Sequence, residues 1–356
     1  MTKLVYFKRT LIIFSLISFG YGQSDFSFKN ISVKDGLAES TVKVIYEDHN
    51  GLMYLGTENG LDVYDGYEFN NYHMNSFDDN SILGNKVSSI SEDKKGNIWV
   101  GTELGVSVFD PRTRTFSRPI NSKELNGNIL EDPETIINDF YGNIWIKLSE
   151  TGKIYKYTDS TNSTSCMNCN NNSELDSLKI TVLFGDYSNT IWFGSESGLF
   201  SYDAKLDKII KYPLEIGMIN SIVNGQENEI WVGSNNGLVK VMNGPNGNYT
   251  IYKKSSSQSS IVSNNVKDLA WDANRKMLWI ATDNGLSRYI PSEDKFFNIQ
   301  TTPYADSIVE NDISELLVAT RSGRLWYTTE TEPGINCLSV EFDSKSKSPP
   351  PANHFE

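Results

Sequence analysis

The chain has little material for a disulfide framework, a metal centre or a polyanion-binding surface. Among 356 residues there are three cysteines and three histidines. Three cysteines cannot make a disulfide framework, and three histidines leave few ligands for a metal site. Lys and Arg number 32 against 45 Asp and Glu, a net charge of −13. This balance argues against nucleic acid and anionic lipid surfaces as partners, because both need a basic footprint.

Long hydrophobic runs are also absent, except near the N-terminus. There, Lys3, Lys8 and Arg9 precede an apolar run of 10 residues, Thr10 to Phe19, and Gly20-Tyr21-Gly22 places small residues before Gln23. This is the layout of a secretory signal peptide over residues 1–22, and spanning a bilayer takes about 20 residues. We therefore expect an exported, periplasmic, acidic protein, with an uncleaved anchor as the alternative.

What the sequence does contain is a repeat. The segment G-N-I-W-V-G-T at 96–102 recurs as G-N-I-W-I at 142–146, T-I-W-F-G-S at 190–195, E-I-W-V-G-S at 229–234 and M-L-W-I-A-T at 277–282. Two weaker copies, L-M-Y-L-G-T at 52–57 and E-L-L-V-A-T at 315–320, flank these five. The marker positions are Tyr54, Trp99, Trp145, Trp192, Trp231, Trp279 and Leu317. Their mean spacing of about 44 residues is the length of a propeller blade.

A glycine six residues after the marker confirms the phase of six copies. These glycines are Gly60, Gly105, Gly198, Gly237, Gly285 and Gly323. Three of them follow Asn, and Asn-Gly is a strong hairpin signal because both central residues of a type I′ turn need a positive φ. In the second copy, the alternation and turn residues predict four strands: Val87–Glu92, Asn97–Thr102, Val106–Asp110 and Thr115–Arg118.

Seven copies of four strands predict an all-β fold, a single seven-bladed β-propeller over residues 24–330; a solenoid is the alternative. The seventh copy supplies three strands, at Asp306–Asn311, Glu315–Thr320 and Arg324–Thr329. The N-terminal strand Phe26–Ser32 would then complete the last blade from outside and close the ring, which removes exposed sheet edges. Segment 331–356 is left over: a surplus strand at Asn336–Phe342 and a Pro/Ser-rich tail, either frayed or the start of another domain.

The residues of the repeat point to a family. The units at 42–66 (VKVIYEDHNGLMYLGTENGLDVYDG) and 87–110 (VSSISEDKKGNIWVGTELGVSVFD) closely resemble the two-component regulator propeller repeat, and I-S-V-K-D-G-L-A-E-S-T-V at 31–42 is similar to the segment that leads into its first blade. The resemblance covers about residues 25–330. It is degraded in the third copy, where Lys147-Leu148 replaces Gly-Thr, and in the seventh, which has no Trp at the marker.

The resemblance implies a periplasmic sensor of histidine kinases or hybrid two-component systems, many of which detect oligosaccharides. It also implies downstream partners: an immunoglobulin-like triple-tyrosine sandwich, whose opening the tail at 348–356 resembles, then a membrane helix and a kinase, in a dimeric full-length relative. This chain has no ATP-binding region or phospho-accepting histidine context, so kinase activity is not expected in it.

Other motifs are better explained by structure than by chemistry. The Asp-x-x-Gly segments Asp48–Gly51, Asp93–Gly96 and Asp139–Gly142 fall short of a calcium loop and fit tight turns. We expect no cofactor and no metal. The mid-strand tryptophans Trp99, Trp145, Trp192, Trp231 and Trp279 are expected in the core, packed between adjacent sheets.

The cysteines and histidines give no clear chemistry either. Cys166-x-x-Cys169 without a second pair is weak evidence for zinc and could form a loop disulfide, while Cys337 is expected to be buried. His49 and His73 fall in turn or loop contexts, and His354 in the tail.

Function is expected on the face that carries the repeat-glycine turns and the long connections between blades. Those connections are His73–Lys86, Pro119–Thr135, Thr158–Lys179 and Lys253–Asn265. The candidate contacts for a ligand or a docking partner are His73, Phe77, Asp78, Glu103, Glu196, Asp283 and Arg321. The favoured function is a non-catalytic sensor that binds an oligosaccharide or docks onto a partner domain; the alternatives are an exported polysaccharide lyase or glycosidase, or a secretion-associated scaffold.

Overall fold

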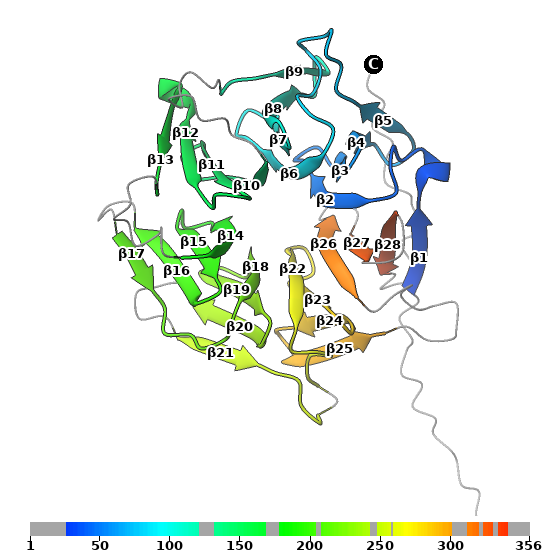
Figure 1. Cartoon of the computed structure of the whole chain (residues 1–356). Helices are drawn as coiled ribbons and strands as arrows, with labels where there is room; N and C mark the ends of the chain where they lie inside the picture. Colours follow the sequence, from blue (N-terminus) through cyan, green and yellow to red (C-terminus); the bar gives the residue numbers. More distant parts are fainter. Residues whose placement is uncertain are drawn as a thin grey trace, which may run out of the picture.

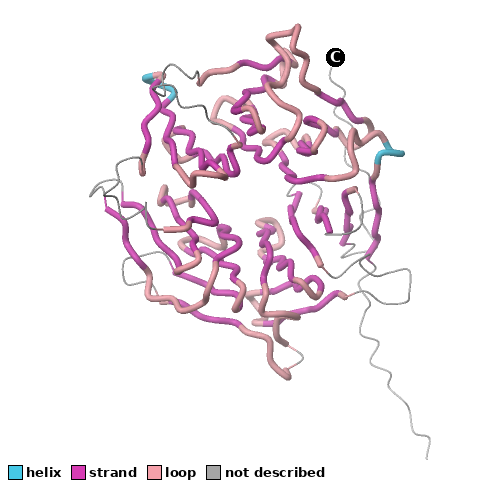
Figure 2. Tube along the Cα trace, in the orientation of Figure 1, coloured by secondary structure: helices cyan, strands magenta, loops and turns pink. Residues whose placement is uncertain are grey.

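Seven four-stranded antiparallel sheets stand around a central axis in the computed structural model (Figure 1). The structure describes residues 26–120, 132–168, 178–203, 208–242, 248–257, 259–300, 312–319, 323–329 and 334–340. Within these ranges the only helices are two three-residue 3₁₀ turns, η1 (Val33–Asp35) and η2 (Asp159–Thr161), so the tube view is almost wholly strand and loop (Figure 2). The predicted all-β seven-bladed propeller is confirmed.

Each blade is a meander whose first strand lies nearest the axis. Blade 1 consists of β2 (Val42–Glu47), β3 (Met53–Thr57), β4 (Gly60–Tyr64) and β5 (Phe69–Tyr72). Blade 2 consists of β6 (Val87–Glu92), β7 (Ile98–Thr102), β8 (Gly105–Asp110) and β9 (Thr115–Ser117). Blade 3 consists of β10 (Pro133–Asn138), β11 (Asn143–Leu148), β12 (Ile154–Thr158) and β13 (Ser163–Cys166). Blade 4 consists of β14 (Ile180–Gly185), β15 (Ile191–Ser195), β16 (Gly198–Asp203) and β17 (Lys208–Lys211).

The remaining blades follow the same order. Blade 5 consists of β18 (Ile219–Asn224), β19 (Glu229–Ser234), β20 (Gly237–Met242) and β21 (Tyr249–Tyr252). Blade 6 consists of β22 (Val266–Asp272), β23 (Met277–Thr282), β24 (Gly285–Ile290) and β25 (Lys295–Ile299). Blade 7 consists of β26 (Ile313–Ala319), β27 (Arg324–Thr329), β28 (Ile335–Val340) and the N-terminal β1 (Phe26–Ile31).

The N-terminal strand closes the ring, as predicted, but the composition of the last blade differs from the prediction. Strand β1 pairs with β28, so the segment at Asn336–Phe342 that seemed surplus is mostly the third strand of this blade. The sheet therefore continues to Val340, beyond the predicted domain boundary at residue 330. The strand predicted at Asp306–Asn311 lies outside the described residues.

The marker of the seventh blade lies on a different strand from the one that the sequence predicts. In blade 2, the marker Trp99 on the second strand lies opposite Val108 on the third strand. In blade 7, Trp326 on the second strand, β27, lies opposite Cys337 on the third strand, β28, so the marker is Trp326 and not Leu317. Leu317 belongs to the first strand, opposite Trp326. By the same register, Gly323 precedes the marker strand and corresponds to Gly96, not to the repeat glycine Gly105.

The hydrophobic core lies between the blades, with each marker aromatic packed into the next sheet. Trp99 packs against Tyr157 of blade 3, and Trp145 against Tyr202 of blade 4. The series ends with Trp326 of blade 7, which packs against Tyr64 of blade 1. The side chains of the five tryptophans placed in the core by the sequence are at most 4% exposed. Seven clusters of this kind join the ring into one body.

Candidate functional site

The strand order gives the ring two different faces. In a four-stranded meander, the turn between the second and third strands lies at the same end as the connection to the next blade. We call this end the connection face, and the opposite end, which carries the turn between the first and second strands, the turn face. Hydrogen bonds agree with the topology, because the backbone N–H of Gly60 donates to the carbonyl of Asn85 at 2.6 Å. The repeat-glycine turns thus lie on the connection face, as the sequence predicts.

Three of the predicted contacts hold the connection face together. The carboxylate of Glu103 accepts hydrogen bonds from the backbone N–H groups of Asn85 (3.2 Å) and Lys86 (2.8 Å). The carboxylate of Glu196 pairs with Lys179 at 3.1 Å. In blade 6, Asp283 accepts a hydrogen bond from the side chain of Asn265 at 3.0 Å. These acids therefore tie each turn to the segment before the first strand of the same blade, a structural role.

The remaining candidate residues differ in their location and exposure. Phe77 and Asp78 belong to the connection between blades 1 and 2, where the Phe77 side chain is 99% exposed. His73, just after β5, is also exposed. Arg321 lies outside the described residues. Among the candidates that do not hold the repeat-glycine turns, His73, Phe77 and Asp78 are all exposed on the connection face.

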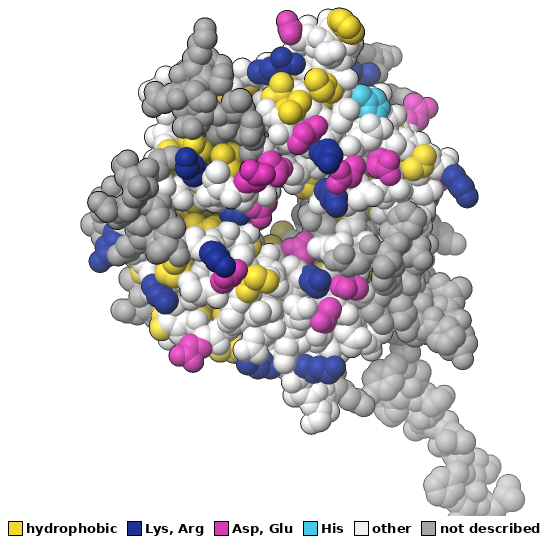
Figure 3. Space-filling view, in the orientation of Figure 1, with side chains coloured by type: hydrophobic (Ala, Val, Ile, Leu, Met, Phe, Trp, Pro, Cys, Tyr) yellow, Lys and Arg dark blue, Asp and Glu magenta, His cyan; other side chains and the backbone are white. Residues whose placement is uncertain are grey.

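A ring of polar residues surrounds the axis near the connection face. All seven first strands carry a β-bulge at the same point, and such bulges re-aim side chains. The residues at the bulges are Lys43, Ser88, Glu134, Thr181, Asn220, Lys267 and Ser314. None of them is buried. One face of the molecule shows acidic and basic side chains around the central opening (Figure 3).

Some bulge residues link neighbouring blades. The hydroxyl of Ser88 donates to the carbonyl of Pro133 at 2.8 Å, and the side-chain amide of Asn220 donates to the carbonyl of Val266 at 2.7 Å. Each bond runs from one first strand to the next. These bonds satisfy carbonyls beside the axis and help to fix the spacing of the blades.

Blade 3 departs from the repeat at the axis. In the other blades, the residue before the last residue of the second strand is small. In blade 2 this residue is Gly101, where an added Cβ would lie 2.8 Å from the carbonyl oxygen of Pro133 on the next blade. Lys147 occupies this position in blade 3, with its side chain only 4% exposed and its Nζ paired with Glu134. The degraded third copy therefore places a buried lysine at the bulge, paired with the exposed Glu134.

The turn face is built on the Asp-Gly turns. In blade 3, Asp139 Oδ1 accepts from the backbone N–H groups of Tyr141 (2.9 Å) and Asn143 (2.8 Å), and Oδ2 accepts from Trp145 Nε1 at 3.0 Å. Asp93 and Trp99 form the same bond at 3.1 Å in blade 2. The aspartates thus cap turns and bind the marker tryptophans, as the structural interpretation of the motif predicts.

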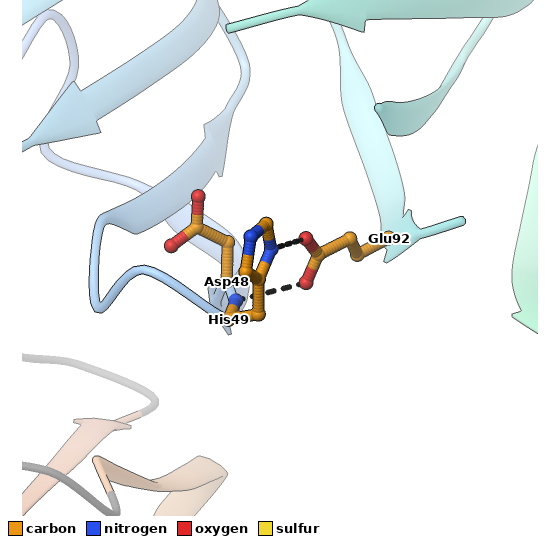
Figure 4. Close-up of side chains that lie close together, drawn as sticks. All are labelled: Asp48, His49 and Glu92. Atoms are coloured by element: carbon orange, nitrogen blue, oxygen red, sulfur yellow. Dashed lines mark hydrogen bonds and ion pairs between the residues drawn. The ribbon is translucent and has the colours of Figure 1, made fainter. Parts of the chain in front are cut away.

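One cluster on the turn face has the residue types of a cation site. Ligand atoms of Asp48, His49 and Glu92 lie within 4.8 Å of one another. Figure 4 shows Asp48 and His49 on the turn of blade 1 and Glu92 reaching toward them from blade 2. Glu92 accepts the backbone N–H of His49 at 2.9 Å and also contacts the Nδ1 atom of its ring. The sequence did not predict this cluster, although Glu92 follows Glu47 by one repeat.

The contacts of these three residues explain the cluster without an ion. Asp48 Oδ1 accepts two backbone N–H groups, from Asn50 (2.8 Å) and Leu52 (2.9 Å), and Oδ2 accepts the hydroxyl of Tyr54 at 3.3 Å. Burial, and next the charge of Asp48, raise the pKa of Tyr54, so its hydroxyl remains a donor. Asp48 therefore has the same capping role as Asp93 and Asp139, while the His49–Glu92 pair joins two blades.

The turn face also carries exposed aromatic residues that the sequence analysis did not select. Phe140, Tyr141 and Tyr187 are 64%, 72% and 75% exposed, at the tips of the turns of blades 3 and 4. Aligning the two residues that follow each turn aspartate would have revealed them. The pairs are His49-Asn50, Lys94-Lys95, Phe140-Tyr141 and Tyr187-Ser188 in the first four blades.

The cysteines take the structural roles that the sequence allowed. Cys166 is disulfide-bonded, and Cys169 lies outside the described residues. Cys337 is free and buried, and burial raises the pKa of its thiol to about 11.

The comparisons with known proteins agree with this architecture. A family model described as the two-component regulator propeller matches residues 81–103. Histidine kinase P4 from Formosa agariphila is 38% identical over 76 residues, which are 21% of this chain and 6% of that kinase.

Solved structures share the fold. Two structures of the extracellular domain of BT4673 from B. thetaiotaomicron, named as a one-component and as a hybrid two-component system, superpose with TM-scores of 0.69 and 0.68 at 22% and 20% identity. They cover 88% and 87% of this chain but only 40% and 39% of that domain. A streptogramin B lyase superposes with a TM-score of 0.65 at 15% identity, over 88% of this chain and 98% of the lyase.

No helix among the described residues is long and apolar enough to cross a membrane. The expected signal peptide, residues 1–22, lies outside those residues.

The match to the family model begins in the connection before blade 2 and ends at Glu103, after the marker strand β7. Residues 81–103 therefore match the two-component regulator propeller repeat, and they lie within a closed ring of seven blades.

Proposed function

We propose that this chain is the sensor propeller of a two-component signalling system, exported to the periplasm, and that it recognises an oligosaccharide or docks onto a neighbouring domain. The observation that carries the proposal is the family match at residues 81–103. These residues contain the first two strands of blade 2, which the other blades repeat. The similarity to a histidine kinase over 76 residues supports it.

The alternative of an exported lyase or glycosidase rests on fold alone. The streptogramin B lyase shares the ring at 15% identity. In this chain, His49 belongs to the turn face and His73 to the connection face, so these two histidines do not form one site. The sensor role is therefore the better supported proposal.

Calorimetric titration of the full chain with oligosaccharides, together with an assay for reducing or unsaturated ends, tests the proposal. We expect saturable binding of one oligosaccharide class without product release. Release of products would instead support the enzyme, and the absence of binding across neutral and acidic oligosaccharides would contradict oligosaccharide sensing.

The cellular part of the proposal has its own test. We expect the mature protein in the periplasm to begin at Gln23, which N-terminal sequencing of the exported chain would show. A full-length protein carrying a membrane helix and kinase downstream of the propeller would supply the signalling partners. Because the chain is acidic overall, with a net charge of −13, we expect no binding to nucleic acid.

A further inference from the structure

Basic and aromatic side chains lie on three neighbouring turns of the turn face, where Lys94 contacts the Phe140 ring, Phe140 contacts Tyr141, and Tyr187 lies on the next turn. Lys94, Phe140, Tyr141 and Tyr187 come from the turns of blades 2, 3 and 4, and we call them the turn-face arc. The three aromatic side chains are 64–75% exposed. Exposed large apolar residues gathered in one region commonly mark a binding site.

The backbone beneath the arc is fixed by hydrogen bonds between blades. The N–H of Phe140 donates to Asn189 Oδ1 of blade 4 at 3.0 Å, and the N–H of Tyr187 donates to Asn224 Oδ1 of blade 5 at 3.2 Å. Within blade 3, Asp139 holds the N–H of Tyr141. The rings are therefore presented on rigid turns, which reduces the entropy lost when a ligand binds.

The charge within the arc is positive, although the whole chain is acidic. Lys94 Nζ lies 4.6 Å from the centroid of the Phe140 ring. Within the described part of the chain Lys94 has no carboxylate partner, whereas the adjacent Lys95 pairs with Asp159 at 2.6 Å. An exposed ammonium group beside aromatic rings is available to an anionic ligand.

We propose that the turn-face arc binds an acidic oligosaccharide, with the apolar faces of its sugar rings on Tyr141 and Tyr187 and a carboxylate or sulfate beside Lys94. This inference rests on the proposed sensor function and names its ligand class and its face. Aromatic side chains offer a flat apolar surface with a polar edge, which suits sugar rings. The connection face is the poorer site, because Glu103, Glu196 and Asp283 there are engaged in structural contacts.

Calorimetry on the full chain tests the proposal with three probes: an alginate hexasaccharide, a sulfated carrageenan hexasaccharide and neutral laminarihexaose. Alginate and carrageenan separate the two sources of negative charge. We expect one acidic probe to bind at least about tenfold more tightly than laminarihexaose, and Tyr141→Ala or Tyr187→Ala to weaken that binding by about tenfold or more. Lys94→Gln should remove most of the preference for the acidic probe and reduce the salt dependence of binding.

Tyr67→Ala is the matched control, because Tyr67 is 71% exposed in the β4–β5 turn of blade 1, outside the arc. We expect this variant to bind like the wild type. Binding that is unchanged in the three arc variants but lost in Phe77→Ala would overturn the arc and leave the sensor proposal standing. The same holds if laminarihexaose binds best.

Failure of all three probes to bind the wild type would count against both proposals, and one further titration separates them. Binding of an acidic peptide that Tyr141→Ala abolishes would show the arc to be a protein-docking surface and overturn the oligosaccharide assignment. The sensor function would then stand through its docking form alone.

Discussion

At the residue scale, the blades whose marker is a tryptophan differ in how its Nε1 atom is hydrogen-bonded. Blade 4 shows the common solution, in which Trp192 donates to Asp186 at 2.9 Å. Blade 5 has Gly225 in place of the aspartate, and there the buried Trp231 Nε1 has no hydrogen-bond partner among the described residues. Glu229, which replaces the asparagine of blades 2 and 3, instead pairs with Lys240 at 2.6 Å. Blade 5 thus has a Glu229–Lys240 ion pair in place of the Asp–Trp hydrogen bond of blade 4, and this ion pair does not satisfy the indole N–H of Trp231.

This exchange predicts the outcome of a two-residue swap. Gly225→Asp alone should lower the free energy of unfolding by about 1 kcal/mol or more, because its Cβ would lie 2.5 Å from Glu229 Oε1 and two carboxylates would crowd together. Adding Glu229→Asn removes that crowding and restores the Asp–Asn–Trp residue set of blade 3. The Trp231 ring must shift slightly, because its Nε1 would lie 2.7 Å from the new Cβ, and the hydrogen bond that it then gains is worth about 1 kcal/mol.

Denaturant unfolding of the wild type, the single variant and the double variant measures both effects. We expect the double variant to be at least as stable as the wild type. A double variant no more stable than Gly225→Asp would contradict a stabilising role for the Asp–Trp bond. Lys240 loses its partner in the double variant, but its side chain is 26% exposed and its ammonium group can hydrogen-bond to water.

At the element scale, the closure of the ring depends on the pairing of β1 with β28. Residues directly opposite on antiparallel strands point to the same side of the sheet, about 4.5–5.5 Å apart. Lys29 lies opposite the free Cys337, and Asn30 lies opposite Asn336.

The register therefore predicts a specific cross-link. Lys29→Cys should form a disulfide with Cys337 under mild oxidation, which a shift in non-reducing electrophoresis would detect. Asn30→Cys, one residue along and pointing to the other side, is the matched control and should remain reduced. Equal cross-linking of both variants, or of neither, would show that the strands pair in another register.

The last blade also shows where sequence reasoning stops. The four-strand repeat, the closing N-terminal strand and the strand bounds of blade 2 were predictable to within a residue or so, because alternation and turn glycines are strong local signals. The marker of the seventh copy was predicted wrongly because E-L-L-V-A-T at 315–320 resembles the marker strand. Gly323 lies six residues after Leu317, which is the spacing of a repeat glycine, but it lies three residues before the true marker, Trp326. Strand pairing between distant segments resolved the ambiguity, and a single sequence does not contain that information.

The candidate site was less predictable for a related reason. The sequence pattern places the acidic candidates of the connection face in exposed turns, but it does not show their hydrogen bonds. Glu103, for example, accepts two backbone N–H groups. The cluster of Asp48, His49 and Glu92 and the turn-face arc both combine residues from adjacent blades. They become visible only when residues one repeat apart are placed side by side.

At the scale of the whole molecule, the seven inter-blade clusters form a closed cycle. Trp279 of blade 6 shares one cluster with Leu325 of blade 7, and Trp326 of blade 7 packs against Tyr64 of blade 1. Every blade therefore has two neighbours, and none is a free end. Loss of one blade exposes the flank of two others, so the ring should unfold in a single cooperative transition.

The cooperative ring predicts the effect of opening it at one place. Removing residues 24–32 deletes β1, takes away Ile31, which is 1% exposed in the cluster of Trp326, and leaves the edge of β28 unpaired. Truncating a buried isoleucine alone costs about 2–5 kcal/mol, so Ile31→Ala should lower the thermal midpoint and the deletion should lower it further. Val33→Ala, two residues beyond at a side chain that is 52% exposed, is the control and should leave the midpoint unchanged. Scanning calorimetry of the three variants should show one transition each, displaced in that order. An unchanged midpoint in the deletion variant would mean that β1 does not close the ring, and a separate early transition would mean that blade 7 unfolds on its own while the other six remain folded.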